Sequence, residues 1–178
     1  VDNIENVIGS QGNDILKGDA TNNILVGQEG DDTFYLTFGQ DIIDGGVDNT
    51  NGTLDIANGE AGLGDSIIVT SEYTTGITFN FFENRVYFTD DSNILDEANK
   101  LNTKIYNIEN ITGSSESDIF IVTGKQLSID GANNNSGIGD TLSFVEMTEL
   151  IKIDLDVTTT QNINLNDTKV LKVTNINF

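Results

Sequence analysis

Four nine-residue units follow one another from Gly9 to Asp44 without a gap. Every unit carries a large apolar residue at its eighth position: Leu16, Leu25, Phe34 and Ile43. Glycine recurs at the first and fourth positions, and aspartate recurs at the sixth position, where Asn23 is the exception. Glycine and aspartate favour turns, whereas a few apolar residues between turns favour a strand. The pattern therefore predicts a turn and a very short strand, repeated every nine residues.

Because each unit reverses the chain direction, two units should form one coil of eighteen residues, with turns alternating between two edges. Neighbours in space are then alternate units in the sequence, so Asp14 stacks with Asp32 on one edge and Asn23 with Asp41 on the other. The glycines should lie where the backbone has positive φ or where carbonyls gather, and we expect this of Gly9, Gly12, Gly27, Gly30 and Gly39. Ordinary β-turns are the alternative interpretation, but four units in unbroken register favour a shared ligand.

These units resemble the glycine- and aspartate-rich nonapeptides of the RTX (repeats-in-toxin) calcium-binding family. The resemblance implies an all-β fold: a parallel β-roll or β-solenoid with short strands and calcium-binding turns, plus β-hairpin segments between blocks. Calcium takes about six to eight oxygen ligands, which carboxylates and turn carbonyls supply. The chain has no histidine or cysteine, the residues that zinc prefers.

Ligand positions are carried over from the family's pattern. The resemblance implies carbonyl ligands and one carboxylate in each turn, and several Ca²⁺ ions, more of them in the first block than in the second. The candidate metal residues are Ser10, Gly12, Asp14, Gly27, Glu29, Gly30, Asp32, Asp41, Gly45, Asp65, Asp118, Gly131 and Asp140. Asn23 replaces the charged ligand beside Asp41, so we expect that edge to bind weakly or not at all.

A longer repeat divides the chain into two blocks. Residues 4–10 (IENVIGS) return as residues 108–114 (IENITGS), and residues 43–46 (IDGG) return as 129–132 (IDGA). The second block looks like the first with one coil removed, and Leu127 stands where an aspartate would be needed. The predicted domains are a first block over 1–107, with nonapeptides 9–44, an insertion 47–62 and a hairpin segment 66–107, and a shorter degenerate block over 108–178.

Within the hairpin segment, residues 76–81 alternate polar and apolar side chains, residues 83–85 favour a turn, and residues 86–88 run back. One feature of the nonapeptides is unusual. The seventh position should point outward, yet it holds Ile15, Ile24 and Ile42. We expect hairpins or adjoining segments to cover at least one sheet face, and ordinary partial exposure is the alternative.

The net charge of −21, with only eight basic residues, argues against nucleic acid and anionic membranes as partners. It also predicts that aspartate-lined turns repel one another without calcium, so that folding is coupled to ion binding. The chain has no cysteine and therefore no disulfide. No apolar run approaches the roughly twenty residues that span a bilayer, so we expect no membrane insertion.

No catalytic constellation is visible, and the aspartates fall at repeat positions, so we do not expect an enzyme. The favoured function is a calcium-binding structural or interaction module of an extracellular RTX protein, of the adhesin or surface-layer type, that folds after type I secretion. An accessory folding and secretion domain of a secreted enzyme or toxin is one alternative, and a carbohydrate-binding module is another. Expected partners are neighbouring modules of the same protein, other copies or cell-surface glycans, outside the cell or on its surface.

Overall fold

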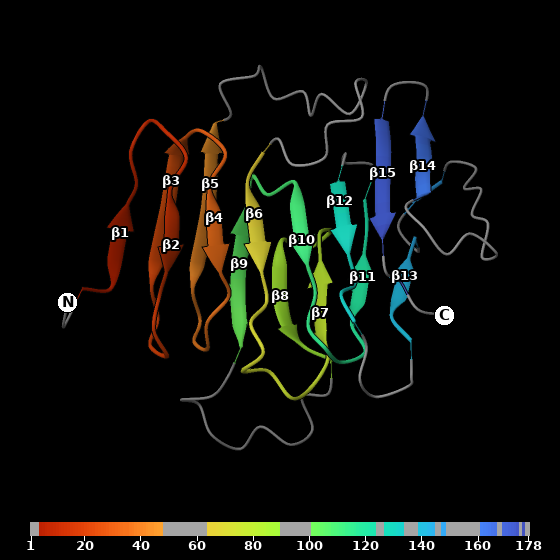
Figure 1. Cartoon of the computed structure of the whole chain (residues 1–178), viewed down its shortest axis with the longest axis horizontal. Coiled ribbons are helices and arrows are strands. Elements are labelled where there is room, and N and C mark those ends of the chain that lie inside the picture. The colour runs from red at the N-terminus through yellow and green to blue at the C-terminus, as the bar shows by residue number, and fades with distance from the viewer. Residues whose placement is uncertain are drawn as a thin grey trace.

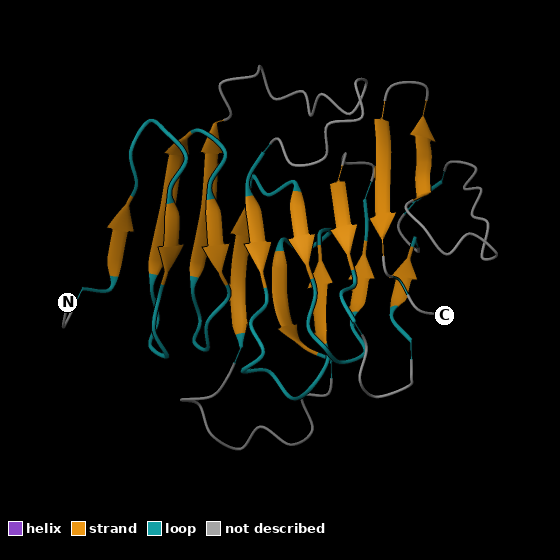
Figure 2. Ribbon diagram, in the orientation of Figure 1, coloured by secondary structure: helices purple, strands orange, loops and turns teal. Residues whose placement is uncertain are grey.

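The computed structural model describes residues 4–47, 64–89, 101–123, 127–133, 139–144, 147–148, 161–166, 169–174 and 176. Across these residues the secondary structure consists of strands, and none of them lies in a helix (Figure 2). This part of the chain accordingly has no helix long and apolar enough to cross a membrane. Residues 48–62 of the predicted insertion and residues 134–138 of the second block lie outside the described residues.

The strands form two sheets whose members are mostly parallel (Figure 1). In spatial order the eight-stranded sheet contains β1 (Asn6–Ile8), β3 (Ile24–Glu29), β5 (Ile42–Val47), β9 (Asn102–Tyr106), β8 (Arg85–Phe88), β7 (Ile77–Asn80), β11 (Ile119–Ile121) and β13 (Thr141–Ser143). The seven-stranded sheet contains β14 (Gln161–Asn166), β15 (Lys169–Thr174), β12 (Leu127–Asp130), β10 (Asn110–Thr112), β6 (Ser66–Ile68), β4 (Thr33–Tyr35) and β2 (Ile15–Lys17).

From β1 to β6 the chain alternates between the two sheets, strand by strand. Ile15 pairs with Thr33 and Ile24 pairs with Ile42, so one coil contains eighteen residues, as the repeat predicts. The prediction of an all-β chain with short parallel strands is confirmed. Neither sheet closes on itself, and the arrangement is consistent with a β-roll.

The predicted hairpin is also confirmed, and it lies inside the eight-stranded sheet. Strand β8 is antiparallel to both β7 and β9, while β9 is parallel to β5 and β7 is parallel to β11. The turn between β7 and β8 ends at Asn84, which has φ of 54°. The three strands thus carry the sheet across the predicted boundary between the blocks. The division at residues 107 and 108 stays a prediction.

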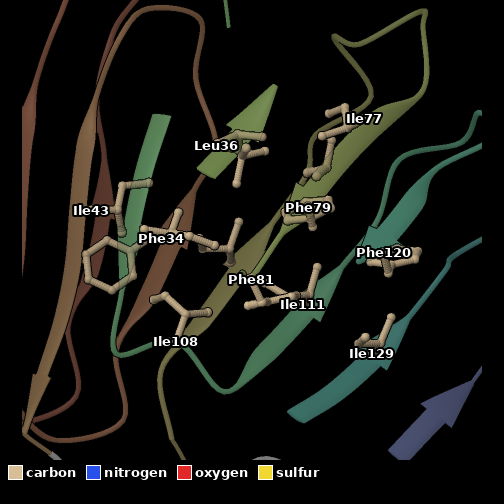
Figure 3. Packing of buried hydrophobic residues seen from close by; sticks show 14 of the residues in the cluster. Phe34, Leu36, Ile43, Ile77, Phe79, Phe81, Ile108, Ile111, Phe120 and Ile129 are labelled. Carbon is tan, nitrogen blue, oxygen red and sulfur yellow. The ribbon is translucent and has the colours of Figure 1, made fainter. Parts of the chain in front are cut away.

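The hydrophobic core lies between the two sheets (Figure 3). The eighth-position residues Leu25, Phe34 and Ile43 are fully buried there, and Phe79 stacks on Phe120 with ring centroids 5.4 Å apart. Burial of one such side chain stabilises the fold by about 1.5–3 kcal/mol. The core therefore continues from the nonapeptides through the hairpin into the second block.

The seventh-position isoleucines have different surroundings. Ile15 is 73% exposed and Ile24 is 41% exposed, whereas Ile42 is half-buried. The first two agree with ordinary exposure rather than with a covered face. Within the described residues, the predicted coverage of a sheet face is therefore not seen at Ile15 and Ile24.

Candidate calcium sites

A row of carboxylates runs along the edge where the strands of the seven-stranded sheet begin. Asp32 Oδ1 accepts the backbone N–H of Asp14 (N···O 2.8 Å), and Asp65 Oδ1 accepts that of Asp32 (2.7 Å). Glu109 Oε2 accepts the N–H of Asp65 (3.0 Å) and takes the place of the next aspartate. We call Asp14, Asp32, Asp65 and Glu109 the first carboxylate row. The last three acids of the row are thereby each bound to the coil that precedes them.

Beside this row, glycines leave room for oxygen atoms. A Cβ built on Gly9 would lie 2.5 Å from Asp14 Oδ2 and 2.6 Å from the carbonyl oxygen of Gly27. A Cβ on Gly27 would overlap Asp32 Oδ2 and lie 2.5 Å from the carbonyl oxygen of Gly45. In each coil, a carboxylate oxygen and a carbonyl oxygen of the following coil therefore converge on one small space. Only glycine leaves this space open.

Gly45 repeats the arrangement, because a Cβ there would overlap Asp65 Oδ2 and the carbonyl oxygen of Asn107. Asn107 has φ of 52°, in the left-handed region that asparagine tolerates. Neither Asn107 nor Glu109 was among the predicted metal residues. The sequence feature that could have indicated them is their position on either side of Ile108, where the longer repeat begins again.

The surroundings of Asp32 show whether the first carboxylate row suits a cation. Its side chain is fully buried, and its Oδ2 has no hydrogen-bond partner. Both Asp32 Oδ2 and the nearby Gly45 carbonyl are acceptors, and burial raises the pKa of the Asp32 carboxyl above its usual value. A buried carboxylate oxygen that has no donor and lies beside a carbonyl oxygen needs a cation or a proton. The hard oxygen donors fit calcium.

On the opposite edge, protein donors satisfy the corresponding groups. Asp41 Oδ1 accepts the N–H of Asn23 (2.8 Å), and Asp41 Oδ2 accepts the hydroxyl of Thr37 (3.2 Å). Asn23 Oδ1 accepts the N–H of Asp19 (2.8 Å). Burial raises the pKa of Asp41 to about 6. Fewer oxygens remain for a cation here than beside Asp32, and weak binding at this edge stays a prediction.

The candidate aspartates of the second block, Asp118 and Asp140, lie on this opposite edge as well, because they precede strands of the eight-stranded sheet. Asp118 accepts hydrogen bonds from the N–H of Ile77 (2.8 Å) and from the N–H and hydroxyl of Ser114 (both 2.7 Å). Asp140 Oδ1 accepts the N–H of Asp118 (2.9 Å). Burial raises the pKa of Asp118. The carbonyl of Gly131 completes this cluster, 3.2 Å from a Cβ built on Gly113.

The family model of the RTX calcium-binding nonapeptide repeat (4 copies) matches residues 2–34 and 18–50. Residues 2–50 belong to the RTX calcium-binding repeat family. No curated protein matches the chain. Because RTX nonapeptides bind calcium, this segment is a calcium-binding module of an RTX protein. It contains β1 to β5 and the first two acids of the first carboxylate row.

The remaining candidate ligands of the RTX segment occupy varied surroundings. The Ser10 N–H donates to Asp14 Oδ2, and Glu29 lies half-buried at the end of β3. Gly30 and Gly39 have φ of 113° and 123°, as expected of turn glycines. Gly12 does not need to be glycine for its φ or for space, because its φ is not positive and a Cβ there would meet nothing within 4 Å. Its carbonyl stays a predicted calcium ligand.

In the RTX segment the candidate donor sets combine carboxylates with carbonyls. Throughout the described residues, no three side chains of histidine, cysteine, aspartate or glutamate come together as a metal cluster. Each space in the first carboxylate row pairs one carboxylate with a carbonyl of the next coil. An ion held there would therefore bind two coils at once.

Proposed function

We propose that this chain is a calcium-dependent structural and interaction module of an extracellular RTX protein, of the adhesin or surface-layer type. In this proposal calcium binding drives folding. The observation that carries it is the buried Asp32 Oδ2, which has no hydrogen-bond donor and lies with the Gly45 carbonyl oxygen around the space that Gly27 leaves open. A calcium ion supplies positive charge there when bound.

The chain's own residues then couple one coil to the next. Asp32 Oδ1 holds the backbone of the preceding coil, while its Oδ2 faces a carbonyl of the following coil. Neutralising one carboxylate therefore removes repulsion between two coils, in a chain whose net charge is −21. Ordering should spread along the stack, because each coil gains most of its burial from its neighbours.

The proposal includes a β-roll as the finer description of the fold and assigns more ions to the first block than to the second. Donors already occupy both oxygens of Asp41 and Asp118, whereas Asp32 keeps one oxygen for a cation. The RTX family suggests a secreted bacterial protein, and type I secretion before folding fits the proposed calcium coupling. We propose no enzymatic role, since the chain contains no histidine and no cysteine.

Single-molecule force spectroscopy tests the structural role. The chain is stretched between its two ends in saturating calcium and again in a chelator. We expect a distinct unfolding force in calcium, and an extension without a force peak in the chelator. Equal unfolding forces in the two buffers would refute a calcium-stiffened module.

A further inference from the structure

The outward face of the eight-stranded sheet differs in chemistry from the rest of this acidic chain. Strand register places Ile24, Ile42, Lys104 and Arg85 in one row, each beside the next on neighbouring strands. Their side chains point away from the core, because the residues that alternate with them are buried. Two cations and two isoleucines thus share one surface.

Lys104 and Arg85 lie directly opposite each other on antiparallel strands. Like charges in this position repel and destabilise a sheet. Within the described part of the chain neither residue forms an ion pair, and Arg85 Nε is buried without an acceptor. The chain has 29 acidic residues, yet none of the described ones neutralises this pair.

Apolar and aromatic side chains surround the two cations. Ile8 is 69% exposed, and Tyr106 is 40% exposed two residues beyond Lys104 on the same face of β9. Further outward residues of this surface are Val26, Ile42 and Tyr87, all half-buried. Asp44 pairs with Tyr106 in the register, but its carboxylate accepts the side-chain amide of Asn107 (2.8 Å). The acid nearest in the register is therefore already hydrogen-bonded.

The seven-stranded sheet provides a comparison within the same molecule. Beyond Ile15 its matching outward row runs through Thr33, Ser66, Asn110 and Ser128, which are polar and uncharged, and the register continues to Lys172 on β15. A row of this kind suits contact with water. Among the described side chains, this row follows one exposed isoleucine, Ile15, with uncharged polar residues, whereas the row of the eight-stranded sheet places two isoleucines beside two cations that form no ion pair.

We propose that the outward face of the eight-stranded sheet, over β1, β3, β5, β9 and β8, binds a partner protein segment that presents a carboxylate between aliphatic side chains. The carboxylate meets Lys104 and Arg85, and the aliphatic groups cover the isoleucines. A branched aliphatic row offers no hydrogen bonds to sugar hydroxyls, and a net charge of −21 repels polyanions. These two features favour a sparsely charged protein segment over an acidic glycan.

This inference deepens the proposed interaction role, and its residues lie outside the first carboxylate row. A suitable test is an NMR titration of the ¹⁵N-labelled chain at fixed free calcium, with folding verified by circular dichroism. The probes are an acetylated hexapeptide of alternating valine and glutamate, and its valine–lysine counterpart. We expect the glutamate peptide alone to shift amide signals of β5, β8 and β9. If folding proves not to depend on calcium, the two peptides can still be compared on the folded chain.

Single variants then locate the contact. Arg85→Gln and Lys104→Gln should each weaken binding of the glutamate peptide by about two- to fivefold, the range for an exposed ion pair. Lys17→Gln is the matched control, because Lys17 is an exposed lysine on the other sheet and pairs with Glu72. It should leave binding unchanged.

Five outcomes would overturn the proposal. The glutamate peptide fails to bind, or both peptides shift the same signals equally. Binding survives Arg85→Gln and Lys104→Gln. A concentration-dependent dimer in sedimentation experiments disappears with Lys104→Gln, which would make a second copy the occupant. A uronate oligosaccharide binds this face more tightly than the glutamate peptide.

Discussion

Replacing Gly27 by alanine is the sharpest structural test of the calcium row, because its matched control lies in the same repeat. A Cβ on Gly27 would overlap Asp32 Oδ2 and lie 2.5 Å from the Gly45 carbonyl oxygen, so one of these groups must move. Overpacking of this kind costs about 1–3 kcal/mol. The displaced oxygens are also the proposed calcium donors, so a higher calcium concentration should be needed for folding.

Gly12→Ala is the control. Gly12 has no positive φ, and a Cβ there meets no atom within 4 Å. Alanine at such a position restricts the unfolded chain and stabilises a protein by about 0.4–1 kcal/mol. The two variants should therefore differ by about 1.4–4 kcal/mol, although both change glycine to alanine in a nonapeptide.

Urea unfolding in saturating calcium measures both free energies, and a calcium titration of each variant gives the midpoint for folding. We expect Gly27→Ala to be destabilised and to need more calcium, while Gly12→Ala matches or exceeds the unmodified chain. Equal free energies of unfolding for the two variants would refute the reasoning. A larger loss of unfolding free energy in Gly12→Ala than in Gly27→Ala would refute it as well.

Three further predictions concern single side chains. Asp32→Asn should raise the calcium midpoint in circular dichroism at least about tenfold, because a lost charge–cation contact costs more than about 1.4 kcal/mol. Asp41→Asn should raise the midpoint less. Equal shifts in the two variants would contradict the proposal that the two edges bind calcium unequally. In calcium-free buffer the chain should gain strand signal as the pH falls from about 7 to about 4, because a folded pKa of about 6 for Asp41 favours the neutral acid, whose stabilisation is full below the unfolded pKa and lost as pH rises through 6. Asp41→Asn should weaken this pH dependence in circular dichroism, and urea unfolding at about pH 4 should show the same direction. Ala132→Gly should stabilise the fold by about 0.5–1 kcal/mol in the same assay, because Ala132 has φ of 61°, and an unchanged or lower stability would argue against strain there.

Local pattern was enough to predict the coil and the hairpin. The spacing of Leu16, Leu25, Phe34 and Ile43 defines the eighteen-residue register, because one apolar residue per unit must face the core. The stacking of Asp14 with Asp32 follows from that register. The turn between β7 and β8 was visible in the alternation that stops and resumes around it.

Which edge the second block uses could not be read from the sequence. Residues 6–8 form β1 of the eight-stranded sheet, but their echo at residues 110–112 forms β10 of the seven-stranded sheet. The motif is repeated half a coil out of phase, so Asp118 lies on the edge opposite Asp14. The phase depends on β7, β8 and β9 all joining one sheet, which is a matter of long-range pairing.

The antiparallel pairing of β14 with β15 escaped prediction for a similar reason. No turn signature like that of the nonapeptides marks the segment between them. Glu109 was missed because a glutamate in the aspartate position reaches the same N–H through one more methylene group. A search for aspartates at fixed spacing does not find a position where another residue type supplies the same hydrogen-bond acceptor.

Circular dichroism during a calcium titration tests the central claim most directly. We predict little strand signal in the calcium-free chain at neutral pH and a cooperative gain of strand signal with a midpoint on the order of 10⁻⁴–10⁻³ M calcium, as in extracellular calcium modules. Magnesium at the same concentrations should not replace calcium, because it requires tight octahedral geometry. A strand signal that is already complete without calcium, and that a chelator leaves unchanged, would contradict calcium-coupled folding.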